Sequence, residues 1–142
     1  ARGEGVERCL RQSRESLQIL AACSFALARE AAPRLAGRVP GLRKELYERR
    51  AREGALLWLL GRLVSAVPSL ALAVVFEQLE TQYIFGLYAS GLPGSPGRCG
   101  RLEEVFGEAD ACLALLEKGD VEGFSARLCG LCRARCAELA PF

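Results

Sequence analysis

The stretch ALLWLLGRLVSAV, residues 55–67, decides the fold of this chain. Its apolar residues recur at intervals of three and four, which is the repeat of one buried face of an α-helix. They are Leu56, Leu59, Leu60, Leu63, Val64 and Val67. Pro68 follows where a new helix could begin, because the first N–H groups of a helix have no acceptor within it. We therefore expect a helix over residues 55–67 and a second one from Pro68 to about residue 88.

An apolar run of this length must also be considered as a membrane span. Residues 55–76 are about long enough to cross a bilayer. However, Arg62 lies inside the run, Gly61 and Pro68 interrupt it, and no belt of aromatic residues flanks it. These features favour two buried helices over one membrane helix.

Helical repeats continue on both sides of this stretch. They predict further helices over residues 6–31, 42–52, 102–118 and 121–139. We expect Pro33 and residues 37–40 to break the chain after the first helix, and the Gly/Pro-rich residues 89–100 to form a loop. Gly119 suits a left-handed helix end, and Asp120 suits the N-terminal cap of the last helix.

No convincing alternating pattern of β-strands accompanies these helical repeats. The sequence therefore predicts an all-α fold, an antiparallel bundle of about six helices that forms one domain over residues 1–142. At 142 residues the chain is long enough to bury a core. Because it does not begin with Met, we expect a fragment or processed chain whose partner domain lies upstream.

The composition argues against several classes of function. With no His, the chain lacks the commonest metal ligand and the usual base of catalytic triads and Cys–His pairs. A net charge of +2 does not suggest a polyanion as direct partner. We expect no enzyme activity, no cofactor, no metal and no membrane insertion. Seven Cys without a signal-peptide pattern indicate free thiols in a reducing, cytoplasmic setting.

Three stretches, in order, resemble motifs of one known family. Arg14–Gln18 with residues 20–22 is similar to an opening Arg-x-x-Leu-Glu helix. Residues 57–70 are similar to a Phe-His…Ser-Gly-Asn-Pro-Leu segment. Residues 108–120, which end in Glu-Lys-Gly-Asp, are similar to Glu-His-x-x-Ile…Gly-Asp. The chain thus resembles the FCD domain, the C-terminal ligand-binding domain of a large subfamily of bacterial GntR transcription regulators.

The departures from that family bear on its metal site. Many members hold a metal ion with one Asp and three His, and the corresponding places here are Gly54, Trp58, Ala109 and Leu131. None of these side chains can ligate a metal. The resemblance therefore implies a metal-free, homodimeric sensor of a small anionic or acyl effector. Such a sensor would reach DNA only through a domain outside this chain.

Arg14 is the first candidate ligand-binding residue. It interrupts an apolar stripe between Leu10 and Leu17. A guanidinium in that place could grip a carboxylate or phosphate with two hydrogen bonds. The alternative is an arginine that reaches the solvent or pairs with an acid of the chain, such as Glu15.

Trp58, Arg62 and Ser65 form a second stripe on their helix, at spacings of four and three. As a pocket wall they would supply an aromatic surface and an anion anchor, with Ala109 and Leu131 as apolar lining. As structural residues they would form a polar edge with Trp58 in the core or at a dimer contact. We favour the pocket for Trp58 and the polar edge for Ser65.

The cysteines of the last helix give a C-x2-C-x3-C spacing: Cys129, Cys132 and Cys136. The outer two would lie about 10 Å apart along a helix, too far for one tetrahedral zinc ion. A two-thiol site completed by Cys99 or Cys112 stays open, but we favour buried core cysteines.

Two other readings of the chain remain. The basic run over residues 43–52 is interleaved with glutamates, so we interpret it as a solvated helix face rather than a DNA-binding surface. As an alternative to the sensor, the chain could be a helical protein–protein interaction or scaffold module with a filled interior and no small-molecule ligand.

Overall fold

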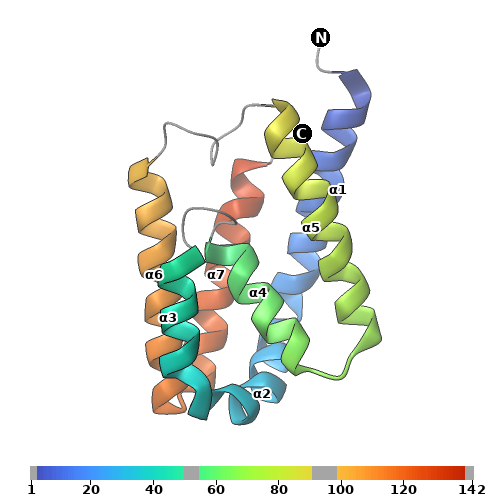
Figure 1. Cartoon of the computed structure of the whole chain (residues 1–142). Helices are drawn as coiled ribbons and strands as arrows, with labels where there is room; N and C mark the ends of the chain where they lie inside the picture. The colour runs from blue at the N-terminus through green and yellow to red at the C-terminus, as the bar shows by residue number, and fades with distance from the viewer. Residues whose placement is uncertain (1–2, 50–54, 91–98, 140–142) are drawn as a thin grey trace.

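The computed structural model describes residues 3–49, 55–90 and 99–139, which form a bundle of α-helices without β-strands. The predicted all-α bundle is confirmed (Figure 1). The helices, with one 3-10 turn named η1, are α1 (Gly3–Ala22), α2 (Ser24–Leu35), η1 (Ala36–Arg38), α3 (Val39–Arg49), α4 (Ala55–Ala66), α5 (Leu70–Ser90), α6 (Cys99–Lys118) and α7 (Val121–Glu138).

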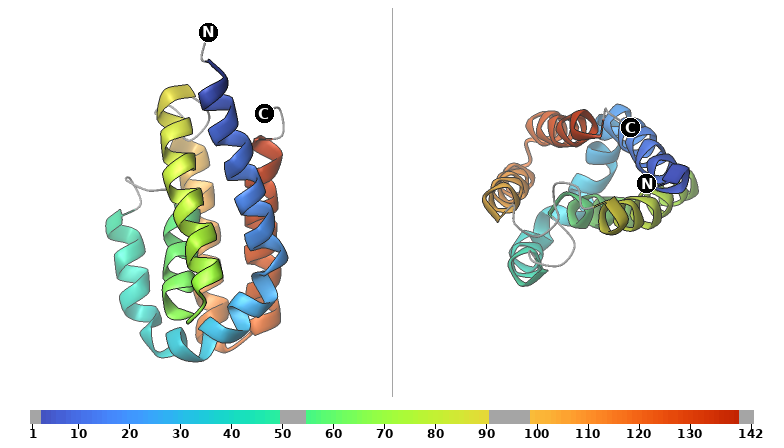
Figure 2. Two further views of the ribbon diagram at one scale, coloured as in Figure 1. Left: turned by 90° about the vertical axis from the view of Figure 1, so that its right-hand side faces the viewer. Right: turned by 90° about the horizontal axis from the view of Figure 1, so that it is seen from above.

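Helix α4, the helix of residues 55–67 in the prediction, lies in the interior of the bundle. Every residue from Ala55 to Leu60 is buried, followed by Leu63 and Val64. Such complete burial needs neighbours on several sides, and α4 packs against α2, α5 and α6. In the view from above, α4 lies between α3 and α5 (Figure 2).

Most of the other helices pack in antiparallel pairs. The most extensive pairing joins α1 to α5, and α1 also packs against α7 (Figures 1 and 2). Helices α6 and α7 form a hairpin at Gly119 and Asp120. Gly119 has a positive φ of 76°, and the Asp120 carboxylate accepts a hydrogen bond of 2.9 Å from the Gly123 N–H. The left-handed conformation predicted for Gly119 and the N-terminal cap predicted for Asp120 are therefore confirmed.

The first predicted helix is in fact two helices. The chain turns at Cys23, so that residues 6–31 of the prediction are divided between α1 and α2. Pro33 does not break α2, because it lies within the last turn, where its missing N–H removes one hydrogen bond shortly before the helix ends. Over residues 37–40, where we expect a break, the chain instead forms η1 and the first turn of α3. Pro40 fits this first turn, because the N–H group that it lacks would have no acceptor within the helix.

Several other boundaries differ from the prediction by a few residues. Helix α5 begins at Leu70, two residues after Pro68, so the single apolar run is two helices as expected. The predicted loop over residues 89–100 is helical at both ends, and residues 91–98 lie outside the described part. Residues 50–54, which include Gly54, also lie outside it.

Among the described helices, none combines the length and apolar character of a membrane span.

Two glycines, one at the end of α6 and one within α7, test the backbone conformation at the α6–α7 hairpin. Gly119 is left-handed, whereas Gly130 lies within α7 with open space where a Cβ would stand. We expect Gly119→Ala to lower the free energy of unfolding by about 1 kcal/mol and Gly130→Ala to raise it by about 0.5–1 kcal/mol. Urea unfolding followed by circular dichroism measures both. Changes of the same sign would contradict the described hairpin.

Candidate functional site

Two of the predicted site residues meet on one carboxylate. Trp58 and Arg62 lie four residues apart on α4 and therefore share a face of that helix. The Trp58 indole N–H donates a hydrogen bond of 3.0 Å to Glu45 Oε1, and Arg62 Nε lies 3.5 Å from the same oxygen. Glu45 belongs to α3. The two donors and Glu45 form what we call the carboxylate site.

The carboxylate site has hydrogen-bonding capacity that the chain does not use. Arg62 Nε is buried and makes no hydrogen bond, because its approach to Glu45 has the distance of an ion pair but not the geometry of a hydrogen bond. A buried donor without an acceptor is unfavourable. A carboxylate in a better position would therefore gain a hydrogen bond that Glu45 does not make.

A second polar contact fastens α3 to the bundle. Arg43 Nε donates a hydrogen bond of 2.9 Å to Asp110 Oδ1, and the Arg43 guanidinium lies 3.8 Å from Glu117. The hydrogen bond to Asp110 raises the pKa of Arg43, against the opposite effect of desolvation. Helix α3 is thus held to α6 by Arg43 and to α4 by Glu45.

Arg14 has other partners than Arg62. It is half-buried on α1, and its guanidinium donates a hydrogen bond of 3.3 Å to the Leu139 carbonyl oxygen at the end of α7. Its own carbonyl oxygen accepts from the Cys136 thiol at 3.6 Å. Arg14 therefore joins α1 to α7, while Arg62 joins α4 to α3. The described contacts therefore do not place the guanidinium groups of Arg14 and Arg62 in one binding site.

The two predicted apolar wall residues lie at different depths. Ala109 on α6 is fully buried, and Leu131 on α7 is partly buried against the core. Helix α6 packs against both α4 and α7, so Ala109 belongs to the interior between these helices. Across the described residues, no group of three or more Cys, Asp and Glu side chains is placed to hold a metal ion.

Sequence reasoning missed Glu45. The interleaved charges over residues 43–52 indicated a solvated helix face, and this pattern does hold for Lys44 and Glu48, which are exposed. The Glu45 side chain, by contrast, is 27% exposed and turned toward α4. Its partners lie 13 and 17 positions further along the chain, on another helix. Periodicity predicts only which residues share a face of one helix, so it cannot predict this contact.

The thiols of α6 and α7 include two that are completely buried. Cys112 and Cys132 have no exposed surface, while Cys129 and Cys136 are half-buried. Desolvation raises the pKa of both buried thiols to about 12. All six described cysteines are free, and the side chain of Cys99 lies outside the described part.

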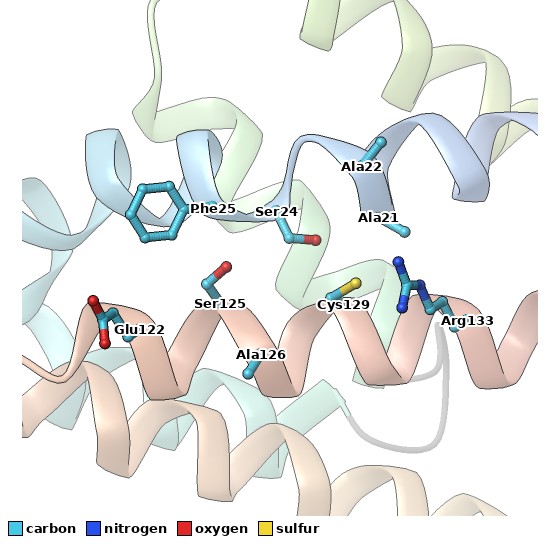
Figure 3. A pocket seen from close by; sticks show the side chains of 9 residues that line it. All are labelled: Ala21, Ala22, Ser24, Phe25, Glu122, Ser125, Ala126, Cys129 and Arg133. Carbon is cyan, nitrogen blue, oxygen red and sulfur yellow. The ribbon is translucent and has the colours of Figure 1, made fainter.

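A surface groove runs between the α1–α2 junction and α7 (Figure 3). Its volume is about 510 Å³, and it is open to the solvent. Its lining residues are Ala21, Ala22, Ser24, Phe25, Glu122, Ser125, Ala126, Cys129 and Arg133. None of the five predicted ligand-binding residues lies among them. The sequence carried no signal for this groove, because it depends on how α7 packs against the turn at Cys23.

Comparisons with protein-family models, curated proteins and solved structures give no match to this chain. The relation to the FCD domain therefore stays a proposal that rests on the three sequence motifs.

The buried thiols predict a loss of stability in alkali. Both stay protonated in the folded protein up to about pH 12, whereas the unfolded chain loses these protons above its ordinary pKa of 9.0. We therefore expect the free energy of unfolding to fall above pH 9, by up to about 1.4 kcal/mol per pH unit for each thiol.

Guanidinium unfolding of wild type and Cys132→Ala in reducing buffer, between pH 8 and 10, measures this effect. The variant should show a shallower fall than wild type. Equal pH dependence of the two proteins would contradict the burial of this thiol.

Proposed function

We propose that this chain is the effector-sensing and dimerisation domain of a bacterial GntR-type transcription regulator. It is not an enzyme, works in the cytoplasm and binds a small anionic or acyl effector without a metal ion. DNA is contacted only through a domain outside this chain. The observation that supports effector sensing is the convergence of Trp58 and Arg62 on a carboxylate. These donors form a binding site for a carboxylate, and Glu45 occupies it.

The proposed switch is an exchange of carboxylates. Glu45 is attached to the same chain, so an effector replaces it only if it makes contacts beyond those of a single carboxylate group. The unused Nε donor of Arg62 supplies one additional contact. Ala109 is fully buried, so an acyl group would contact it and other interior apolar residues only after the helices move apart. An effector that binds better when Glu45 is displaced shifts the population toward that state.

The signal passes from α4 into α5, because only three residues, Val67 to Ser69, separate the two helices. The start of α5 carries apolar residues in solvent, with Leu70 exposed to 82% and Val74 to 49%. No charged residue occurs between Arg62 and Glu77. A symmetric dimer places a patch against its own copy, so an uncharged apolar patch suits a second copy of this chain.

Substitutions at the carboxylate site test the exchange. Glu45→Gln removes the internal competitor, so we expect it to bind responsive organic acids about tenfold more tightly. Arg62→Gln should abolish the response, because it removes the cation. Thermal shift against a panel of organic acids and acyl-thioesters identifies responsive compounds, and calorimetry gives the affinities.

The matched control for this experiment is Glu48→Gln, which alters an exposed carboxylate on the same helix. It should respond like wild type. If no organic acid stabilises wild type or Glu45→Gln, the sensing role is wrong.

The α5 patch is tested by placing charges in it. Leu70→Glu and Val74→Glu should convert a dimer into a monomer, because two like charges would face each other across the symmetry axis. Size-exclusion chromatography with light scattering measures the mass. Ala137→Glu places the same charge on an exposed position of α7 and should leave the dimer intact. A wild-type monomer would refute this part of the proposal.

The second candidate is a protein–protein interaction module without a small-molecule ligand. It is favoured by the fact that Glu45 already satisfies the Trp58 indole N–H. This candidate predicts that the α5 variants change association while no organic acid produces a thermal shift. The two experiments together therefore separate it from the sensor.

A further inference from the structure

The groove between the α1–α2 junction and α7 has opposite charges at its two ends. Glu122 lies near the start of α7 and Arg133 lies eleven residues further on, both exposed. Their Cα atoms are therefore about 16 Å apart along the helix. Neither side chain makes an ion pair or hydrogen bond with another residue of the described part. Both charges are available to a ligand.

The helix dipole accounts for only one of these two charges. An acidic residue in the first turn is favoured by the positive end of a helix, which suits Glu122. The effect is confined to the terminal turns, and Arg133 lies five residues before the last residue of α7, Glu138. Arg133 therefore lies beyond the reach of the helix dipole. In Figure 3 its guanidinium points across the groove toward Ala21.

The middle of the groove combines hydrogen-bonding groups with small apolar ones. The hydroxyls of Ser24 and Ser125 lie in the gap between the helices (Figure 3). Ser24 Oγ donates its proton to the Leu20 carbonyl oxygen, which leaves its lone pairs as acceptors. Both serines are largely buried, with Ser24 exposed to 2% and Ser125 to 7%, so they form the inner side of the groove. Ala22 and Ala126 are small and exposed, which allows a backbone to approach closely.

An apolar side chain stands beside the acidic end. The Phe25 ring lines the groove on the same side as Glu122 and is 50% exposed (Figure 3). It offers a contact for an apolar ligand side chain. The groove thus presents, in order, an acid with an aromatic ring, hydroxyl acceptors over small residues, and a guanidinium.

We propose that this groove binds a short peptide in extended conformation, with its terminal carboxylate at Arg133 and its terminal ammonium at Glu122. An extended chain advances about 3.3 Å per residue, so about five residues span the two charges. The peptide N–H groups would donate to the serine oxygens. This site lies apart from the Trp58 and Arg62 carboxylate site and goes beyond the function proposed above.

The end charges of the peptide can be tested separately. The isotope-labelled full chain is titrated with penta-alanine in four forms: both ends free, carboxyl end amidated, amino end acetylated, and both ends blocked. Chemical shifts of the groove residues report binding. We expect each blocked end to weaken binding about fivefold, as for an exposed ion pair of about 1 kcal/mol.

Variants assign each end to its partner. Arg133→Gln should remove the preference for a free carboxylate and keep the preference for a free amine, while Glu122→Gln should do the reverse. Arg127→Gln is the matched control, because Arg127 lies on α7 outside the groove and pairs with Glu108 at 3.0 Å. It should keep both preferences.

A steric variant tests the location without altering charge. Ala126→Leu should abolish binding by filling the groove, whereas Ala26→Leu, at an exposed position of α2 outside the groove, should have no effect. Equal affinity for all four peptides, shifts outside the groove, or no binding of penta-alanine would each overturn the proposal. These outcomes are independent of the organic-acid response at Trp58 and Arg62.

Discussion

The constraint on which the structure depends is the burial of the first half of α4. Six consecutive buried residues, from Ala55 to Leu60, leave this helix no solvent face in its first half. A helix of this kind must carry its polar atoms to partners inside the protein. The indole N–H of Trp58 therefore needs an acceptor, and α3 supplies it with Glu45. The packing of the core and the carboxylate site have the same origin.

This arrangement connects the proposed site to the proposed dimer surface. Arg62 lies on α4 only eight positions before Leu70, at the start of α5. A change in how α3 contacts α4 would therefore act close to the exposed apolar residues of α5. Under the proposed exchange, the replacement of one carboxylate partner would change the polar contacts of α4 near the helix that we propose to face a second copy.

The sequence predicts most of the fold and only part of the site. The three-and-four spacing in α4 and the Gly119–Asp120 pair are local signals, and both are confirmed. The turn at Cys23 was missed because no Gly or Pro marks it. The spacing of Trp58 and Arg62 predicts that they share a face of α4, but it does not predict Glu45 as their partner, because contacts between helices depend on tertiary packing. The groove at Arg133 could not be predicted either, because it also depends on how helices pack together.

The chain contains a single tryptophan, so the Trp58 indole N–H gives one unambiguous signal in a nitrogen–proton correlation spectrum. Titration of the wild-type protein with sodium hexanoate, against sodium chloride at equal ionic strength, tests the exchange at the carboxylate site most directly. We predict a saturable shift of this signal with hexanoate alone. An indole signal that stays in place throughout the hexanoate titration would contradict it.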